Sequence, residues 1–300
     1  MEPVLAVVGP TATGKSDLAV ELALRLDGEV VGADAMQLYR GMDIGTAKLT
    51  AEQRRGVPHH LLDVLDVTQE ASLAAYQRAA RAAIGQIRER GRHPVLAGGS
   101  GLYVRAALDA LVIPPTDPDV RAALENRLHE IGPGALHEEL TRVDPVAAQS
   151  ILASNGRRIV RALEVVELTG APFSAVLPEP AYAEPTVQVG LAVERPELDR
   201  RTDGRVDRMW ELGLVAEVER LAAQGLREGR TASRAVGYAQ VLETLDGRST
   251  LDQARQRTAQ ATRRLIRRQE SWFGRDRRIR WLDATAPDLL EQALRAAAGG

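Results

Sequence analysis

Short apolar runs alternate with longer segments of helical periodicity over the first hundred residues. The runs at residues 4–8, 29–33 and 94–97 have the length and composition of buried strands. Between the first two runs, apolar side chains such as Leu18 and Leu22 recur at the spacing of a helical turn. Strands and helices that alternate in this way predict βαβ units and a parallel sheet, in which ligands bind beyond the carboxyl ends of the strands.

The pattern is wholly helical between residues 114 and 183, and proline-rich stretches flank this segment. We interpret it as a helical insertion, with helices near 118–130, 134–140, 145–152 and 156–169, inside an α/β core formed by residues 1–113 and 184–300. After the insertion we expect a strand at 186–193, helices near 197–212, 214–224, 231–246 and 250–273, a strand at 279–282 and a last helix.

The loop after the first strand fits the P-loop pattern G-x-x-x-x-G-K-[ST] and joins a strand to a helix. Its residues are Gly9, Pro10, Thr11, Ala12, Thr13, Gly14, Lys15 and Ser16. Successive amides and the helix N-terminus can bind an anion, Lys15 can neutralise phosphate charge, and the Ser16 hydroxyl can bind Mg²⁺. The motif predicts a P-loop NTPase-like parallel sheet with flanking helices. Its anion is either a transferred phosphoryl group or a departing pyrophosphate.

Two further side chains follow the second and third strands. Asp34 ends the second strand, and Ser100 lies in the glycine-rich stretch 98–101 after the third. In P-loop enzymes an acid at this place binds Mg²⁺ through water or acts as a base toward the acceptor. The Ser100 hydroxyl is either part of the site or the N-cap of the next helix. Because parallel strands end at one edge of the sheet, we expect Asp34, Ser100 and the P-loop to lie together.

Composition narrows the class of protein. Apolar residues make up 44% and charged residues 27% of the chain, and no apolar run approaches the 18 residues of a membrane span. The chain has no cysteine, which removes disulfides and thiolate zinc sites. A strand follows the first residues directly, so we expect no targeting segment. A monomeric cytosolic enzyme without an obligate protein partner is the simplest interpretation.

The histidines do not predict a metal site. His59 and His60 have no acidic partner at ligand spacing, so we expect them to be structural. His129 and His137 fall in the insertion and are expected to face solvent.

Almost all positive charge is carried by arginine. Lys and Arg together number 39, and only Lys15 and Lys48 are lysines. Ten arginines and two acids, Glu270 and Asp276, lie between residues 255 and 280, a local balance of +8. Such a stretch is either a solvated helix face or a surface for a polyanion such as nucleic acid.

Five stretches, in the right order over nearly the whole chain, resemble the tRNA dimethylallyltransferases, also called tRNA Δ2-isopentenylpyrophosphate transferases. They are residues 9–16, 34–48, 58–61, 98–103 and 234–238. The stretch from Asp34 to Lys48 is the most specific of the five. The lack of cysteine fits a bacterial-type member without the zinc-finger extension of eukaryotic members.

The resemblance implies transfer of a dimethylallyl group from dimethylallyl diphosphate to N6 of adenosine 37 in tRNA, with release of pyrophosphate. The P-loop would hold this leaving group, and Lys15, Arg205 and Mg²⁺ on Ser16 would stabilise its charge. Asp34 would accept the N6 proton. Ser100 stands where the family usually carries threonine, so the hydroxyl is kept. Lys48 is expected near the diphosphate or the tRNA backbone.

The resemblance also implies a tRNA surface, because adenine 37 must leave the stacked anticodon loop to reach the diphosphate. Its residues are Asp34, Ala35, Met36, Gln37, Ser100, Arg121, Arg157, Arg158, Ile159, Val160, Arg161, Arg234, Ala235, Val236, Gly237, Tyr238 and Ala239. The insertion would grip the anticodon stem-loop, and part of residues 255–280 would meet the tRNA backbone. Ala35 and Ala239 replace a serine and a basic or polar residue that are usual in the family.

Three alternatives stay open. A small-molecule P-loop kinase could use Asp34 as its base, but it leaves the arginine-rich insertion without a task. An adenylate isopentenyltransferase acting on free AMP has little need of a long helical insertion. A non-catalytic RNA-binding P-loop protein is the third, and an Asp34→Ala variant that loses product while it keeps tRNA affinity would argue against it.

Overall fold

A computed structural model describes residues 2–173 and 179–298. The chain divides into two compact units, residues 1–109 with 182–300 and residues 110–181. The predicted limits of the insertion are 114 and 183, slightly later than the structural ones. The entering and leaving chains explain this difference, because they pair before the first helix: the Ala110 amide donates to the Ala181 carbonyl at 2.8 Å.

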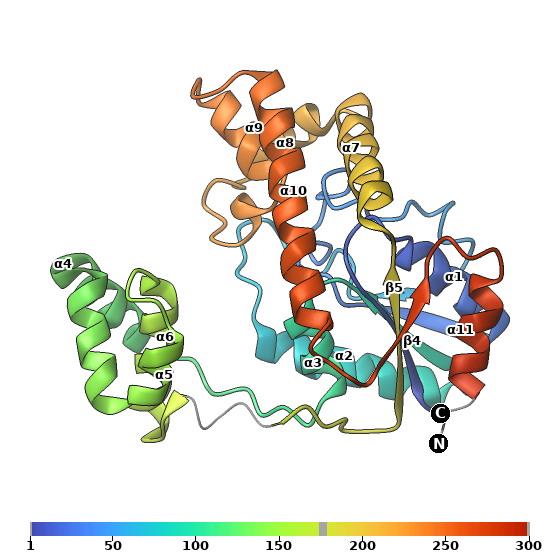
Figure 1. Ribbon diagram of the computed structural model, residues 1–300. Coiled ribbons are helices and arrows are strands. Elements are labelled where there is room, and N and C mark those ends of the chain that lie inside the picture. The colour runs from blue at the N-terminus through green and yellow to red at the C-terminus, as the bar shows by residue number, and fades with distance from the viewer. Residues whose placement is uncertain (1, 174–178, 299–300) are drawn as a thin grey trace. The chain divides into compact units, whose positions relative to one another are not determined.

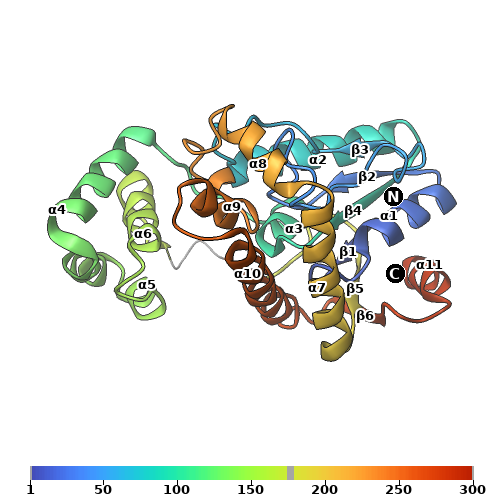
Figure 2. The same ribbon diagram turned by 90° about the horizontal axis from the view of Figure 1, so that it is seen from above.

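Six parallel strands of the larger unit form one sheet, in the order β3-β2-β4-β1-β5-β6 (Figure 2). They are β1 (Val4–Val8), β2 (Gly28–Gly32), β3 (His59–His60), β4 (His93–Gly98), β5 (Thr186–Ala192) and β6 (Ile279–Asp283). β1 is central, with Leu5 opposite Val95 of β4 and Val187 of β5. All five of its residues are buried, as expected for a strand covered on both faces. The predicted parallel α/β fold is confirmed.

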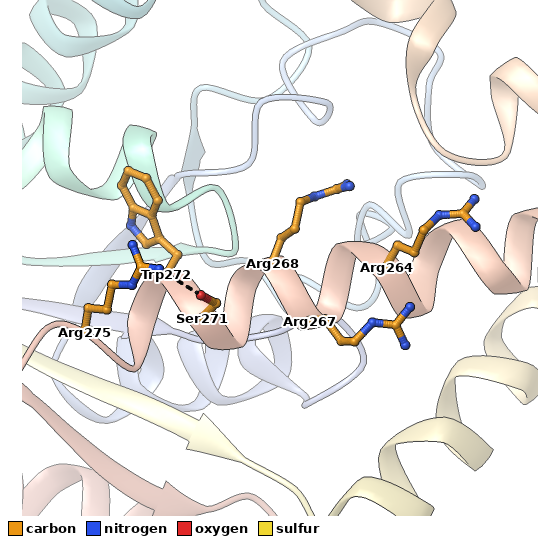
Figure 3. A pocket seen from close by; sticks show the side chains of 6 residues that line it. All are labelled: Arg264, Arg267, Arg268, Ser271, Trp272 and Arg275. Carbon is orange, nitrogen blue, oxygen red and sulfur yellow. Dashed lines mark hydrogen bonds between the residues drawn. The ribbon is translucent and has the colours of Figure 1, made fainter. Parts of the chain in front are cut away.

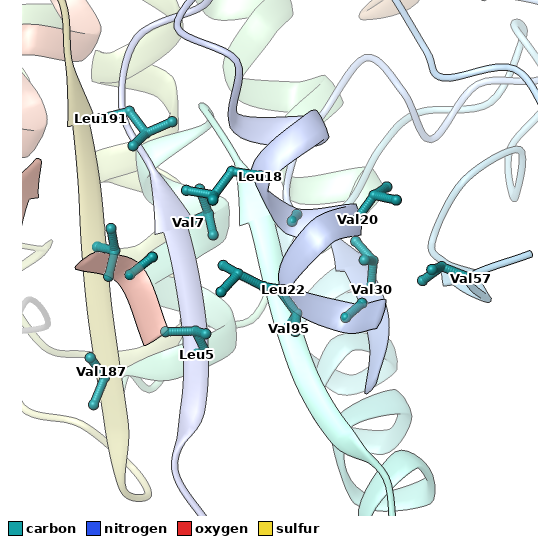
Figure 4. Packing of buried hydrophobic residues seen from close by; sticks show 14 residues of the cluster. Leu5, Val7, Leu18, Val20, Leu22, Val30, Val57, Val95, Val187 and Leu191 are labelled. Carbon is teal, nitrogen blue, oxygen red and sulfur yellow. The ribbon is translucent and has the colours of Figure 1, made fainter. Parts of the chain in front are cut away.

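The two faces of the sheet are covered by different helices. Leu5 and Val7 pack with Leu18 and Leu22 in a core that α1 (Lys15–Arg25) and α11 (Leu289–Ala298) close (Figure 4). The intervening strand residues point to the opposite face. There the sheet is covered by α2 (Leu73–Glu89) and α3 (Gly101–Leu108) (Figure 2). Polar groups are therefore gathered at the ends of the strands.

Four helices lie beyond the carboxyl ends of the strands (Figure 1). They are α7 (Arg195–Glu211), α8 (Leu214–Ala222), α9 (Tyr238–Leu245) and α10 (Leu251–Phe273). A second core joins α7, α8 and α9 to the segment after β2, and Tyr39 and Tyr238 are fully buried in it. α10 begins at a capping box of Thr250 and Gln253 and runs from this core to α3. Its last turns thereby reach the loop that follows β4.

The smaller unit contains α4 (Pro118–Val143), α5 (Pro145–Ser150) and α6 (Gly156–Thr169). Its own core includes Leu136, Leu140 and Ile159. α4 is kinked at Gly132, whose φ of 78° precedes Pro133 and interrupts the helix. The predicted break between residues 130 and 134 is therefore confirmed.

Two elements differ from the prediction. The helix expected at 231–246 is divided into a short 3₁₀ turn (Ala232–Arg234) and α9, because Gly237 adopts a φ of 91° between them. β3 was not predicted, because two residues are too few for an apolar pattern; it is defined by pairing with Val30 and Val31. Over the part of the chain that is described, no helix combines the length and hydropathy needed to cross a lipid bilayer.

Candidate active site

The P-loop connects β1 to α1 through three residues of positive φ, which are Gly9, Ala12 and Gly14. Gly9 has a φ of 130°, and a Cβ there would stand 2.9 Å from the Leu191 carbonyl oxygen. Gly14 has a φ of 86° and is the N-cap of α1. The Thr13 hydroxyl donates to the Pro10 carbonyl at 2.9 Å and closes the loop on itself. Backbone amides at the start of α1 are thus available for an anion.

Lys15 lies within a cluster of charges. Its ammonium donates to the Pro10 carbonyl at 2.5 Å. The pKa of Lys15 is lowered to about 7, chiefly by burial and also by the Arg205 guanidinium, while the Asp34 carboxylate acts in the opposite direction. Burial also lowers the pKa of Arg205, which Asp34 partly offsets. Two cations and one carboxylate, predicted from three separate motifs, are therefore close enough to influence one another.

Asp34 and Ser100 come together at the ends of neighbouring strands. The Ser100 hydroxyl accepts a hydrogen bond from the Ala35 amide at 3.1 Å, and the Ser100 amide donates to the Ala33 carbonyl at 3.2 Å. Asp34 Oδ1 accepts from the Met36 amide at 2.9 Å. Ser100 is the N-cap residue of α3, but its side chain makes no cap hydrogen bond. The hydroxyl therefore joins the Asp34 loop rather than its own helix.

The Thr46 carbonyl accepts hydrogen bonds from the side chains of two predicted site residues. Gln37 Nε2 donates to it at 3.1 Å, and Arg205 Nη2 from α7 donates at 3.3 Å. Gln37 follows β2, whereas Arg205 is more than 150 residues later in the chain. The loop at 43–46 thus determines where both side chains lie.

Glu217 of α8, which was not predicted as a site residue, holds this loop. Its buried carboxylate accepts from the amides of Asp43, Ile44 and Gly45 at 3.0–3.4 Å. The Tyr238 hydroxyl donates to Glu217 Oε1 at 2.5 Å. Burial and the nearby Glu217 charge raise the pKa of Tyr238 well above its usual range. Glu217 has no sequence motif, because its partners are backbone amides far away in the chain.

Lys48 does not reach the phosphate loop, which corrects the expectation for this residue. Its side chain is 2% exposed, and its ammonium donates to Asp43 at 2.7 Å, Asp63 at 2.5 Å and the Tyr39 carbonyl at 2.9 Å. These three bonds use all the donors of an ammonium group. Lys48 therefore fastens the segment that carries Gln37 and Thr46.

Gln269 of α10 is the second residue that sequence reasoning missed. Its Oε1 accepts from the Thr11 amide at 2.9 Å, and its Nε2 donates to the Gly99 carbonyl at 2.9 Å. The Thr11 amide is consequently engaged within the protein. The amides that remain for an anion on the P-loop lie closer to α1.

The tRNA residues predicted in the insertion fall into two groups. Arg121 and Arg161 both donate to the buried carboxylate of Glu164, at 2.8 and 2.7 Å. Burial acts to raise the pKa of Glu164, but these two hydrogen bonds and a third from the Asp117 amide lower it overall. Ile159 and Val160 are buried in the core of this unit, while Arg157 and Arg158 are exposed. The two exposed arginines are the side chains most accessible to a ligand.

The residues predicted at 234–239 are mostly covered. Arg234 is exposed, Val236 and Ala239 are partly buried, and Ala235, Gly237 and Tyr238 are buried. The Tyr238 ring packs against Gly45, where a Cβ would stand 2.3 Å from it. This side chain therefore supports the loop at 43–46 from inside.

The arginines between residues 255 and 280 divide into paired and exposed ones. Arg255, Arg257, Arg263 and Arg278 form ion pairs with Asp207, Glu243, Asp203 and Asp109. Arg264, Arg267, Arg268 and Arg275 are exposed and share one side of the chain with Ser271 and Trp272, where they line a shallow hollow of about 530 Å³ (Figure 3). We call these four arginines the α10 basic face.

His129 is exposed, as expected, whereas the other histidines make contacts within the protein. His60 Nε2 lies 2.6 Å from Glu29 Oε2, and His59 Nδ1 lies 2.9 Å from the Val57 carbonyl, as expected for structural residues. His137 is partly buried against the carbonyls of Ala148 and Ile151 at 3.0 and 2.9 Å, so the expectation that it faces solvent is wrong. In the described residues no three His, Cys, Asp or Glu side chains are grouped to hold a metal. Ser16 remains the predicted Mg²⁺ ligand.

Known proteins are similar in sequence to this chain over nearly its whole length. A tRNA dimethylallyltransferase from Streptomyces avermitilis is 65% identical over 96% of this chain and 92% of its own. One from Thermobifida fusca is 62% identical over 98% and 93%.

Solved structures share the fold. A tRNA isopentenylpyrophosphate transferase from Bacillus halodurans is 41% identical, with a TM-score of 0.72 over 100% of this chain and 95% of that one. A eukaryotic dimethylallyltransferase acting on tRNA is 25% identical, with a TM-score of 0.80 over 99% and 78%. The family model described as IPP transferase matches residues 37–277. The chain therefore belongs to the IPP transferase family.

Proposed function

We propose that this protein transfers a dimethylallyl group from dimethylallyl diphosphate to N6 of adenosine 37 in tRNA and releases pyrophosphate. The observation that carries the proposal is the grouping of Lys15 and Arg205 with Asp34 beside a P-loop. An anionic leaving group needs fixed cations, and a neutral amine that attacks carbon needs a base. The relatives named tRNA dimethylallyltransferase support the same activity.

On the leaving-group side, pyrophosphate is bound by the P-loop amides near α1. Lys15 and Arg205 stabilise the negative charge that develops as the bond between C1 and the diphosphate oxygen breaks. Mg²⁺ fits the donors present, because Ser16 offers a hydroxyl and this ion commonly takes its other ligands from phosphate oxygens and water. When bound, it would add positive charge next to the leaving group.

On the acceptor side, the lone pair of N6 forms the new bond to C1 while one N6 proton moves to the Asp34 carboxylate. The Met36 amide, at 2.9 Å from Oδ1, holds that carboxylate in place. The Ser100 hydroxyl is fixed by the Ala35 amide and can donate to the substrate. Gln37 can read a base edge from the position that the Thr46 carbonyl gives its amide.

The arginines bind the anticodon stem-loop. Exposed Arg157 and Arg158 at the start of α6, together with the α10 basic face, contact phosphates. Arg121 and Arg161 keep their bonds to Glu164 and present their remaining donors to the RNA. The eukaryotic enzyme described as acting on tRNA, which has the same fold, supports an RNA acceptor. We further propose that the protein works as a monomer in the cytosol, where its tRNA substrate is found.

An acceptor competition tests this proposal against its rivals. The protein is incubated with Mg²⁺, dimethylallyl diphosphate and equal concentrations of an anticodon stem-loop RNA and AMP, and in parallel with labelled ATP and candidate hydroxyl acceptors. We expect prenylated RNA and little prenylated AMP. Equal activity on AMP would favour the adenylate enzyme, and phosphoryl transfer without prenyl transfer would favour a kinase.

A further inference from the structure

The Gln269 side chain forms hydrogen bonds with both of the loops that would bind the two substrates. Its carbonyl faces the Thr11 amide of the P-loop, and its amino group faces the Gly99 carbonyl beside Ser100, both at 2.9 Å. A flipped amide would put donor against donor and acceptor against acceptor. The side chain is 9% exposed, so both loops depend on this single orientation.

Side chains of α10 pack closely against the two glycines at 99 and 101. A Cβ on Gly99 would stand 2.5 Å from Gln269 Nε2 and 3.3 Å from the Gly9 carbonyl. Three residues after Gln269, Trp272 covers Gly101, where a Cβ would stand 2.1 Å from the indole ring. The helix therefore contacts the Ser100 loop through two side chains, Gln269 and Trp272, that lie one turn apart on the same side.

We propose that Gln269 is a positioning residue that sets the spacing between the P-loop and the Ser100 loop. This inference rests on the proposed function, in which the first loop holds the diphosphate and the second lies beside the attacking amine. The hydrogen-bond partners of Gln269 are backbone groups of these loops, so it acts on the reaction through them. A displacement at carbon requires the nucleophile and the leaving group to be in line, and small errors in position reduce the rate strongly.

The test compares Gln269→Leu with Gln260→Leu, which makes the same chemical change at an exposed position of the same helix. For Gln269→Leu we expect kcat to fall by about tenfold to a hundredfold. We expect the Kd for inorganic pyrophosphate with Mg²⁺ to rise about tenfold, since the P-loop loses the hydrogen bond that holds it in position at Thr11. The Kd for anticodon stem-loop RNA should stay within about twofold, and Gln260→Leu should match the wild type.

A second variant keeps the test decisive if Gln269→Leu does not fold, as judged by thermal unfolding. Gly99→Ala places a methyl group against Gln269 Nε2 and should displace the amide, with the same fall in kcat. Wild-type kcat and pyrophosphate affinity in a folded Gln269→Leu, or in Gly99→Ala when the first is unfolded, would overturn the inference. A wild-type protein that makes no prenylated RNA would contradict the proposed function instead, and the pyrophosphate affinities would still compare the variants.

Discussion

The Lys15 ammonium is influenced by the charges of Arg205 and Asp34, and its pKa is lowered to about 7, chiefly by burial. Between that value and the ordinary lysine pKa of 10.5, the unfolded chain binds a proton that the folded chain has released. The contribution of Lys15 to stability therefore rises with pH across this window and is least favourable below pH 7. A bound pyrophosphate reverses the balance, because its charge favours the protonated form.

The first prediction is that pyrophosphate binding at pH 8 takes up a proton on Lys15. The free site is mostly neutral at this pH and the occupied site is charged, so affinity should fall as pH rises from 7 to 9. Calorimetric titration in two buffers of different ionisation enthalpy measures the uptake. A Lys15→Gln variant should show none of it, and equal uptake in that variant would assign the proton to another group.

Lys48 has a structural role that the sequence could not reveal. Its position at the end of a family motif suggests a ligand contact, whereas its contacts with Asp43, Asp63 and the Tyr39 carbonyl lie entirely within the protein. These partners are brought to it only by the folded segment, so spacing along the chain does not indicate them.

The second prediction concerns this lysine. Lys48→Met should lower the free energy of unfolding by about 2 kcal/mol, because the buried Tyr39 carbonyl loses its donor. Denaturant unfolding measures the change. Pyrophosphate affinity should remain within about twofold of the wild type under conditions where the variant is folded. A large loss of pyrophosphate affinity with an unchanged free energy of unfolding would instead indicate that Lys48 binds the phosphate.

At the scale of elements, α8 and the start of α9 act on the site through one loop. Glu217 accepts from three successive amides of residues 43–45, and Tyr238 reinforces it. The next residue, Thr46, offers the carbonyl that receives Gln37 and Arg205. Two helical elements thus position a base-reading amide and a cation that belong to other parts of the chain.

The third prediction follows from this arrangement. Glu217→Gln should lower kcat about tenfold, because one oxygen that accepts from the loop becomes a donor and Arg205 loses its fixed partner. Tyr238→Phe should have a smaller effect, with a loss of about 1 kcal/mol in unfolding free energy. Steady-state kinetics and thermal unfolding are compared with Glu219→Gln, an exposed change on the same helix. Unchanged kcat in a folded Glu217→Gln would contradict the role.

Sequence patterns were sufficient for elements with a clear periodicity or motif. β1, β2 and β4 and the loops after them could be predicted because apolar runs end at Gly9, Asp34 and Gly98. The two-residue β3 and the break at Gly237 could not, since both depend on tertiary pairing and backbone conformation. Glu164, Glu217 and Gln269 escaped prediction for a related reason. Each holds groups brought together by folding, and no motif marks it.

At the scale of the whole molecule, positive charge is concentrated in particular surface regions, although the net charge is only −2. Arg255, Arg257 and Arg263 are neutralised by carboxylates, whereas within residues 2–173 and 179–298 the α10 basic face has no such ion pair. The exposed pair Arg157 and Arg158 adds a second basic group on the smaller unit. A polyanion can therefore be bound by a protein that is slightly acidic overall.

The fourth prediction is that RNA affinity falls steeply with salt. Replacing Arg264 or Arg268 with Gln should weaken binding and reduce the slope of log K against log salt by about one per arginine, because fewer counterions are released. Arg257→Gln, which removes an arginine already paired with Glu243, is the matched control. Binding measured between 50 and 200 mM salt gives the slopes. A flat salt response would mean that the α10 basic face is only solvated.

The central claim is that Asp34 removes a proton from N6 of adenosine 37 while the P-loop holds the leaving pyrophosphate. Its most direct test is mass spectrometry of nucleosides from tRNA incubated with dimethylallyl diphosphate and either the wild type or Asp34→Asn. We predict N6-dimethylallyladenosine at position 37 with the wild type and about a hundredfold less with Asp34→Asn, at similar tRNA affinity. The absence of this nucleoside with the wild type, or equal amounts from both proteins, would contradict the account.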